Sequence, residues 1–362
     1  MARLHLPLLL LAAVAATGAA DDRHGRLRLA WELNVAPLTA NPERGAPDLL
    51  ALRFSPDGEW IAALSSRITS EGDRTELLLI PAGGDASKAR RLQIRGSPLN
   101  TPLHTGIHWS PSGEHIAVET TNFGTSILRV SDGARCGLPR ATVFGGFIAP
   151  DKAMAADWEA PTDPASIPAD VSTLTVYGTD CVRQKSWRVP GEVREIEISA
   201  RTGFVALSPK KSGIRILDSA GAERGSYAAG SASMLRFGEK GGALCKADYP
   251  SHGSLACYDL TTGQQFSNPD VIGGAPFDVS LDSSIVVATD GTAAHDMRSG
   301  ESTAGISNWV VWDYRTGREI ARLRYRRQRH AYAFSPAAVA PAGRRFVVGA
   351  GGKLRMYEIA PE

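Results

Sequence analysis

The stretch that decides the fold is Asn308-Trp-Val-Val-Trp-Asp-Tyr-Arg-Thr-Gly-Arg-Glu-Ile-Ala-Arg-Leu-Arg-Tyr325. Residues 309–314 are β-branched and aromatic, a composition typical of strands. Residues 315–317 form a tight turn closed by glycine, and residues 319–325 resume an extended pattern. The stretch therefore predicts a β-hairpin.

The same hairpin recurs along the chain. Tyr258-Asp-Leu-Thr-Thr-Gly263 repeats its strand ending and turn, and looser copies lie at 128–133, 216–221 and 80–84. A second landmark is a tight turn before an apolar strand, and such turns begin at residues 55, 110, 149, 199, 238, 280 and 340. Successive starts are 39 to 60 residues apart, close to the roughly 40 to 50 residues of a propeller blade. A third strand follows in every repeat.

These repeats predict an all-β fold: a seven-bladed β-propeller of four-stranded antiparallel blades. Residues 26–35 alternate apolar and polar side chains, which predicts a strand with one buried face. The last repeat ends near residue 359 with only three strands. We therefore expect the N-terminal strand to pair beside residues 353–359 and to close the ring.

The composition is that of an ordinary soluble globular protein, with 43% hydrophobic residues, 22% charged residues and a net charge of +2. Nothing in it indicates nucleic-acid binding. Residues 1–20 contain a basic start at Arg3, an apolar run at 6–14 and small residues before Asp21. This pattern predicts a signal peptide cleaved near Ala20, because the apolar run is too short to span a bilayer. We expect a periplasmic or secreted single domain at 21–362, without a membrane span and monomeric.

Two segments carry a resemblance to a known family. Phe54-Ser-Pro-Asp-Gly-Glu-Trp-Ile-Ala62 and Trp109-Ser-Pro-Ser-Gly-Glu-His-Ile-Ala117 resemble the blade signature of bacterial WD40-like propellers, a group that includes the TolB propeller and the YVTN-type surface proteins. Val311-Trp-Asp-Tyr-Arg-Thr-Gly317 resembles the WD40 strand ending. The resemblance covers residues 26–359 and implies an exported propeller. The chain departs from the family in having one Trp-Asp pair at the hairpin position and no regular Gly-His pair.

The four cysteines need separate interpretations, because export makes disulfides chemically possible. Cys245 and Cys257 flank a turn centred on Ser251, and hairpin register places them directly opposite each other. We expect a disulfide between Cys245 and Cys257, with two buried free thiols as the alternative. Cys136 and Cys181 follow equivalent turns in successive repeats, which predicts that they lie far apart, with a disulfide between them as the less favoured alternative.

The chain lacks the common catalytic motifs. It has no Gly-x-Ser-x-Gly elbow, no His-Glu-x-x-His pair and no phosphate-binding glycine loop. His104 and His108 are expected on a loop and an incoming strand, not on one helical face. The basic stretch at 322–330 fits an outermost strand with a solvated face, or alternatively an anion-binding patch. No catalytic residue, cofactor or metal site is predicted.

The connections between strands indicate where a partner binds. The lengthened segments are 65–75, 159–170 and 290–307, between the second and third strands of their blades, and 97–106, between two blades. In a propeller all four lie on one face, which predicts a binding face for a protein, peptide or cell-envelope partner. They are alternatively tolerated insertions, and a second functional class is a lactonase or a quinone- or metal-dependent enzyme with a site at the channel mouth. The residues expected to meet a partner are Arg67, Asp73, His104, Asp157, Trp158, Asp163, Tyr249, His252, His295 and Asp296.

Overall fold

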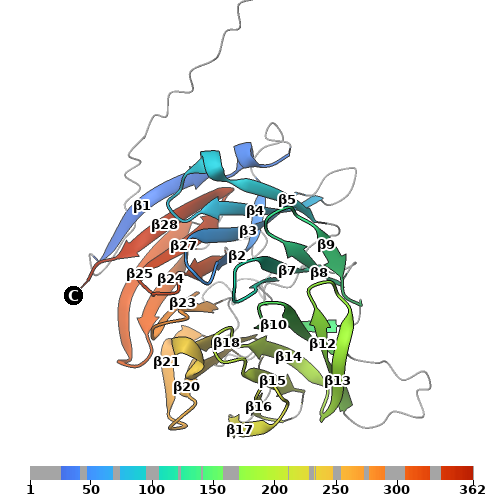
Figure 1. Cartoon of the computed structure of the whole chain (residues 1–362). Helices are drawn as coiled ribbons and strands as arrows, with labels where there is room; N and C mark the ends of the chain where they lie inside the picture. The colour runs from blue at the N-terminus through green and yellow to red at the C-terminus, as the bar shows by residue number, and fades with distance from the viewer. Residues whose placement is uncertain are drawn as a thin grey trace, which may run out of the picture.

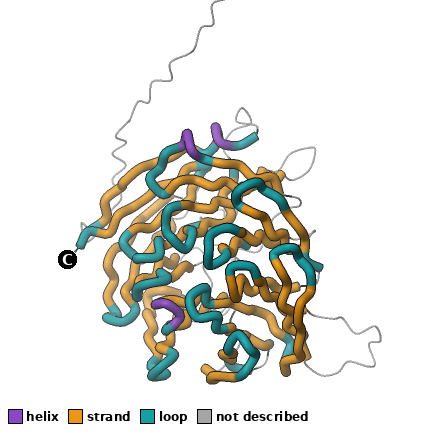
Figure 2. Tube along the Cα trace, viewed as in Figure 1, coloured by secondary structure: helices purple, strands orange, loops and turns teal. Residues whose placement is uncertain are grey.

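The structure is a computed structural model, and its described part consists mainly of strands joined by turns (Figures 1 and 2). The described residues are 26–40, 47–67, 74–94, 106–120, 124–139, 142–157, 171–210, 212–227, 232, 234–247, 254–272, 277–289, 306–326 and 336–361. They include the short 3-10 helices η1 (Ala36–Leu38), η3 (Ala86–Lys88) and η5 (Glu239–Gly241). Within this part of the chain, no helix has both the length and the apolar character needed to cross a membrane.

The strands form seven four-stranded antiparallel sheets, which we number as blades in chain order. Blade 1 contains β2 (Asp48–Phe54), β3 (Trp60–Arg67), β4 (Arg74–Pro81) and β5 (Arg90–Ile94). Blade 2 contains β6 (Ile107–Trp109), β7 (His115–Thr120), β8 (Gly124–Arg129) and β9 (Arg135–Gly137). Blade 3 contains β10 (Thr142–Ala149), β11 (Lys152–Asp157), β12 (Val171–Gly178) and β13 (Arg183–Pro190). Blade 4 contains β14 (Val193–Ile198), β15 (Val205–Pro209), β16 (Ile214–Leu217) and β17 (Glu223–Tyr227).

The remaining three blades complete the ring. Blade 5 contains β18 (Met234–Gly238), β19 (Ala243–Ala247), β20 (Ser254–Asp259) and β21 (Gln265–Ile272). Blade 6 contains β22 (Phe277–Val279), β23 (Ile285–Thr289), β24 (Ile306–Asp313) and β25 (Arg318–Arg326). Blade 7 contains β26 (Ala337–Val339), β27 (Arg345–Ala350), β28 (Lys353–Ile359) and β1 (Leu27–Asn34). The first strands of neighbouring blades contact one another all the way round, from β2 through β6 to β26 and back to β2. The predicted seven-bladed β-propeller is confirmed.

The N-terminal strand closes this ring, as the sequence predicts. β1 lies antiparallel beside β28 as the outermost strand of blade 7, with Leu33 opposite Leu354, and Figure 1 shows the blue β1 against the red β28. Glu32 accepts hydrogen bonds from Lys353 Nζ and Arg355 Nε, both at 2.6 Å. One blade is therefore assembled from the two ends of the domain.

Each blade buries both of its faces against its neighbours, and β4 illustrates how. Leu78 and Ile80 pack toward blade 7 in a cluster with Val347. Leu77 and Leu79 point the other way and join the cluster shared with blade 2. Because side chains alternate across a strand, a strand buried on both faces is a near-continuous apolar run. The Leu-Leu-Leu-Ile sequence of this strand follows from its position between two blades.

The inner turns join the first and second strands of each blade. In the turn of blade 1 the hydroxyl of Ser55 accepts a hydrogen bond from the Trp60 N–H at 2.9 Å, and Asp57 accepts one from the Glu59 N–H at 3.0 Å. Gly58 has a φ of +75°, and a Cβ there would approach Pro341 Cδ of blade 7 to 3.3 Å. The Ser-Pro-Asp-Gly sequence thus serves both the turn and the contact between blades.

The structure contains two disulfides, and one of them corrects the sequence analysis. Cys245 and Cys257 are opposite each other on β19 and β20 and are bonded. Cys136 and Cys181 are also bonded, with Cα atoms 5.8 Å apart, so the prediction that they lie far apart was wrong. The two positions are not equivalent. Cys136 lies on β9, the outermost strand of blade 2, whereas Cys181 lies within the β12–β13 turn of blade 3, and the two side chains pack against the same cluster between these blades.

The basic stretch begins on an outermost strand. β25 is the outer strand of blade 6, in agreement with the edge-strand interpretation. Arg322 on this strand pairs with Glu319 at 2.6 Å, and residues 327–330 lie outside the described part of the chain. The structure therefore places the start of this stretch at a sheet edge.

Candidate functional site

The inner strands place charged side chains at the same position in successive blades. The position lies on the innermost strand, two residues before the first residue of the inner turn. In most blades a polar residue stands there between two apolar ones. The position is occupied by Arg53, His108, Glu197, Arg236 and Asp278 in blades 1, 2, 4, 5 and 6, and by Ala338 in blade 7. In blade 3 two irregularities shift the register of β10 at this level. The repeat of the fold therefore brings these side chains together at the axis.

Four of these groups form an ionic network across the axis. Arg53 Nη1 lies 2.6 Å from Asp278 Oδ1, and Arg53 Nη2 lies 3.4 Å from Glu197 Oε1. Glu197 Oε2 also forms an ion pair with Arg236 Nη1, at 3.1 Å. The second oxygen of Asp278 accepts a hydrogen bond from the Val339 N–H at 3.0 Å, which extends the network to blade 7. With Glu195, these residues are called the axial network below.

Burial controls the ionisation of the network. Desolvation of its buried carboxyl group raises the pKa of Glu195 well above the ordinary value, while the positive charge of Arg236 opposes the rise. Burial also lowers the pKa of Arg236, against the stabilising charge of Glu197. Charged groups in such a place are stable only when they are paired. The pairing of Arg53 and Arg236 with Glu197 and Asp278 meets this requirement.

A second polar pair lies beside the network. His108 Nε2 of β6 is 3.6 Å from Glu119 Oε2 of β7. Glu119 also accepts a hydrogen bond from the Phe144 N–H of the next blade at 3.2 Å, and the Phe144 ring meets the His108 ring edge to face. This pair links blades 2 and 3. His108 lies on the strand β6, as expected, and is engaged within the ring, whereas His104 lies outside the described residues.

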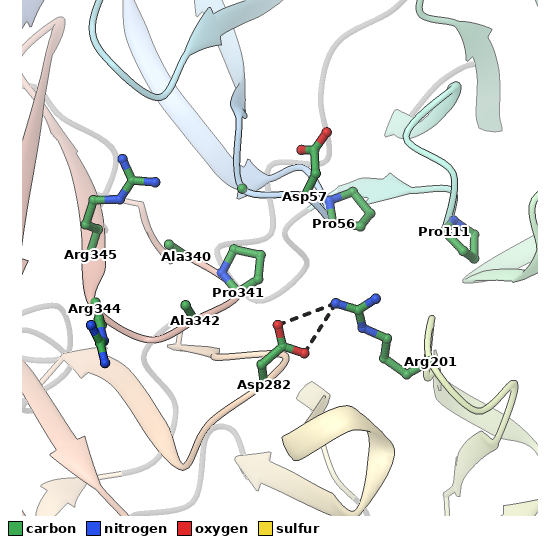
Figure 3. A pocket seen from close by; sticks show the side chains of 11 residues that line it. Pro56, Asp57, Pro111, Arg201, Asp282, Ala340, Pro341, Ala342, Arg344 and Arg345 are labelled. Carbon is green, nitrogen blue, oxygen red and sulfur yellow. Dashed lines mark hydrogen bonds and ion pairs between the residues drawn. The ribbon is translucent and has the colours of Figure 1, made fainter.

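A pocket opens at the mouth of the channel on the face that carries the turns between first and second strands, called the turn face below. Its volume is about 410 Å³. Figure 3 shows that its side chains come from several inner turns and from the start of β27. The lining residues are Pro56, Asp57, Gly58, Pro111, Arg201, Asp282, Ala340, Pro341, Ala342, Arg344 and Arg345. We call this the turn-face pocket.

Most of the residues predicted to meet a partner fall outside the described part of the chain. These are Asp73, His104, Trp158, Asp163, Tyr249, His252, His295 and Asp296. Arg67 is the last residue of β3, beside the segment 68–73. Asp157 is the last residue of β11 and accepts hydrogen bonds from Thr175 Oγ1 at 2.7 Å and Arg183 Nη2 at 3.2 Å. The described partners of Asp157 thus belong to its own blade.

Sequence reasoning missed both the axial network and the turn-face pocket. A usable signal was present, since an apolar-charged-apolar triplet precedes a Ser or Gly in Leu52-Arg-Phe-Ser55, Ile196-Glu-Ile-Ser199, Leu235-Arg-Phe-Gly238 and Phe277-Asp-Val-Ser280. The turn is the feature that recurs, whereas the residue two places before it differs in type from blade to blade. The pocket has no comparable signal, because its lining is assembled from distant turns.

No protein-family model matches the chain, and a search of curated proteins found no match either. The fold itself defines the class: the protein is a seven-bladed β-propeller, an architecture consistent with a WD40-like family.

Proposed function

We propose that the protein is an exported, non-catalytic propeller of the TolB/YVTN type that binds a protein, peptide or cell-envelope partner. The signal-like residues 1–20 support export. The two disulfides support an oxidising compartment, because structural disulfides persist mainly outside the cytosol. The ring supplies the scaffold on which binding segments are held.

The observation that carries this proposal is the distribution of connections along the blades. The connections between second and third strands, and those between blades, leave the ring on the face opposite to the turn face, called the loop face below. The segments 68–73, 95–105, 158–170 and 290–305 all connect strand ends at this face. The inner turns of the turn face are short in every blade. Excess length confined to one face of a rigid ring favours a binding role there.

The axial network supports a scaffold rather than a catalytic centre. The carboxylates of Glu197 and Asp278 are held by Arg53 and Arg236, and the network joins side chains from four blades. Such a network fixes the relative positions of the blades, so the loop face is presented on a stiff frame. The residues proposed to contact the partner are those predicted from the sequence: Arg67, Asp73, His104, Asp157, Trp158, Asp163, Tyr249, His252, His295 and Asp296.

The test is a pull-down from envelope extract with the wild-type protein and a variant in which residues 290–307 are replaced by a short Gly-Ser turn. We expect the wild-type protein to recover a partner that the variant loses. A control variant carries Gly-Ser in place of Thr261 and Thr262, in the β20–β21 turn on the turn face. Equal recovery by all three proteins contradicts the proposal.

One observation favours the second functional class, a propeller enzyme. Carboxyl groups from two blades, those of Glu195 and Glu197 of blade 4 and Asp278 of blade 6, do converge near the axis. Among the described residues, however, no group of three His, Cys, Asp or Glu side chains is arranged to hold a metal ion. A stoichiometric metal or quinone in the purified protein, measured by elemental analysis and absorption spectroscopy, supports the enzyme and opposes the binding proposal.

A further inference from the structure

The turn-face pocket is a second candidate site, on the face opposite to the proposed partner surface. Turns from blades 1, 2, 4, 6 and 7 line it, so it lies over the axis rather than within one blade. Its volume of about 410 Å³ falls in the range of ligand-binding pockets, roughly 300 to 1,000 Å³. The pocket is therefore large enough to hold a short segment of a ligand.

The charges around the pocket do not balance locally. Asp57 is engaged by its own turn, where it receives the Ser55 hydroxyl and the Glu59 N–H. Asp282 of blade 6 is engaged by Arg201 of blade 4 at 3.3 Å, as the dashed lines in Figure 3 show. Both carboxylates of the lining therefore already accept hydrogen bonds from the protein, Asp57 from its own turn and Asp282 from Arg201.

Two arginines of the lining have no such partner. Within the described part of the chain, the side chains of Arg344 and Arg345 make no hydrogen bond or ion pair. Figure 3 shows them on the side of Pro341 away from Arg201, with their guanidinium groups extended in different directions. The lining therefore holds three arginines and two aspartates, a net charge of +1, with Arg344 and Arg345 at one side and the Arg201–Asp282 ion pair at the other.

The rest of the lining is rigid and apolar. Pro56, Pro111 and Pro341 each belong to an inner turn, and proline has a fixed φ and no N–H to donate. A preformed surface loses little conformational entropy when a ligand binds. Guanidinium groups bind carboxylates through paired, charge-assisted hydrogen bonds. The pocket thus combines proline rings, against which a ligand backbone can pack, with the separated guanidinium groups of Arg344 and Arg345, which can bind anions.

We propose that the turn-face pocket binds an acidic peptide segment, with carboxylates on Arg344 and Arg345 and the chain against the three prolines. Two guanidinium groups that extend apart favour a ligand with spaced carboxylates over a single small anion. This site goes beyond the proposed function, because it lies on the turn face, whereas the connection between Thr289 and Ile306 starts and ends at the loop face. Its test is consequently independent of the loop-face experiment.

The experiment measures fluorescence anisotropy of a labelled, end-blocked hexaglutamate peptide with the full-length mature protein. We expect saturable binding that weakens with added salt, and no binding of the matching hexalysine peptide. The variant R344Q/R345Q should bind hexaglutamate at least about tenfold more weakly, because each lost charge-assisted hydrogen bond contributes to affinity. The control R135Q/R188Q removes the same charge from exposed positions on the outer strands β9 and β13 and should bind like the wild type.

Three outcomes overturn the proposal. Equal loss in both double variants attributes binding to net charge alone. The absence of hexaglutamate binding to the wild-type protein removes the site. Binding of citrate or inorganic phosphate that depends on Arg344 and Arg345, without binding of the peptide, assigns the pocket to a small anion instead. The melting temperatures of both double variants are measured as well. Values equal to that of the wild type show that the affinities compare folded proteins.

Discussion

At the residue scale, the most informative feature is charge buried at the axis of an otherwise apolar ring. Arg236 is 3% exposed and Glu195 and Glu197 are each 4% exposed, so none of them is solvated as a surface charge is. Removing one member of a buried ion pair leaves the other charge without compensation. The network therefore makes the stability of the ring sensitive to single substitutions at its centre.

The first prediction concerns Arg236. Replacing it with alanine leaves Glu197 with only the longer contact to Arg53, and we expect a loss of about 3 to 5 kcal/mol in the free energy of unfolding. Urea denaturation measures the loss. The control Arg188→Ala, on an exposed position of β13, should change the free energy of unfolding by less than about 0.5 kcal/mol. Equal stability of the two variants would show that the network is not a structural element.

The second prediction is a pH dependence produced by Glu195. Its pKa in the folded protein lies well above the ordinary value of 4.5, so the folded state retains a proton that the unfolded chain releases once the pH exceeds that value. The free energy of unfolding supplied by this group is complete below the unfolded pKa and is lost as the pH rises toward the folded pKa. Glu195→Gln removes this loss.

We therefore expect the stability of Glu195→Gln, relative to the wild type, to increase as the pH rises above 4.5 toward the raised pKa of the folded protein. Chemical denaturation at several pH values measures the difference. A difference that stays constant across this interval argues that the carboxyl group titrates normally in the folded protein.

The sequence contains the residues of this network but not their convergence. Arg53 and Asp278 are far apart in the chain, and only the closed ring brings them to 2.6 Å. A charged residue inside an apolar strand is also compatible with a solvent-facing position. The distinction depends on knowing that the strand is the innermost one of its blade.

At the scale of elements, neighbouring blades are joined by packing and in one place by a covalent bond. Cys136 of β9 and Cys181 of the β12–β13 turn link blades 2 and 3, whereas Cys245 and Cys257 link two strands of blade 5. The sequence separations are 45 and 12 residues. In the chain-entropy description, the bond that closes the longer loop restricts the unfolded chain more.

The third prediction compares the two disulfides. Replacing Cys136 and Cys181 together with serine should cost about 4 kcal/mol in the free energy of unfolding, and replacing Cys245 and Cys257 about 3 kcal/mol. Denaturation of both variants under the same conditions gives the order, and peptide mapping without reducing agent shows which bonds exist in the wild type. A larger cost for the Cys245 and Cys257 pair, or free thiols at all four positions, is inconsistent with the structure.

The interblade bond also shows the limit of reasoning from repeats. Repeats predict that equivalent positions are separated by one blade, and that rule placed Cys136 far from Cys181. The rule does not describe how an outermost strand packs against the next blade's turn. Contacts of this kind depend on how neighbouring twisted sheets pack together, which periodicity does not encode.

At the scale of the whole molecule, the ring is closed by pairing of β1, the first described strand, with β28, the last one. β1 is far from β28 in sequence and pairs with it along its full length. The blade count, the strand order and this closure could all be predicted, because each follows from strand periodicity and turn spacing. The binding face stays a prediction, since its proposed residues lie mostly outside the described part of the chain.

The fourth prediction tests closure. A mature protein lacking residues 26–35 leaves β28 as an unpaired edge and exposes the apolar side of blade 7, so we expect aggregation or loss of the folded state. Thermal melting followed by circular dichroism and size-exclusion chromatography measure the outcome. A soluble truncated protein with the wild-type melting temperature refutes closure by β1.

We propose that the ring presents its partner surface on the loop face. Site-specific photo-crosslinking tests this proposal, with a photoreactive phenylalanine placed at position 295, in the connection between Thr289 and Ile306, or at Gln184 on the exposed outer strand β13. In envelope extract we predict a discrete crosslinked adduct from position 295 and none from Gln184. An adduct from Gln184 alone, equal yields from both positions, or no adduct from position 295 contradicts the claim.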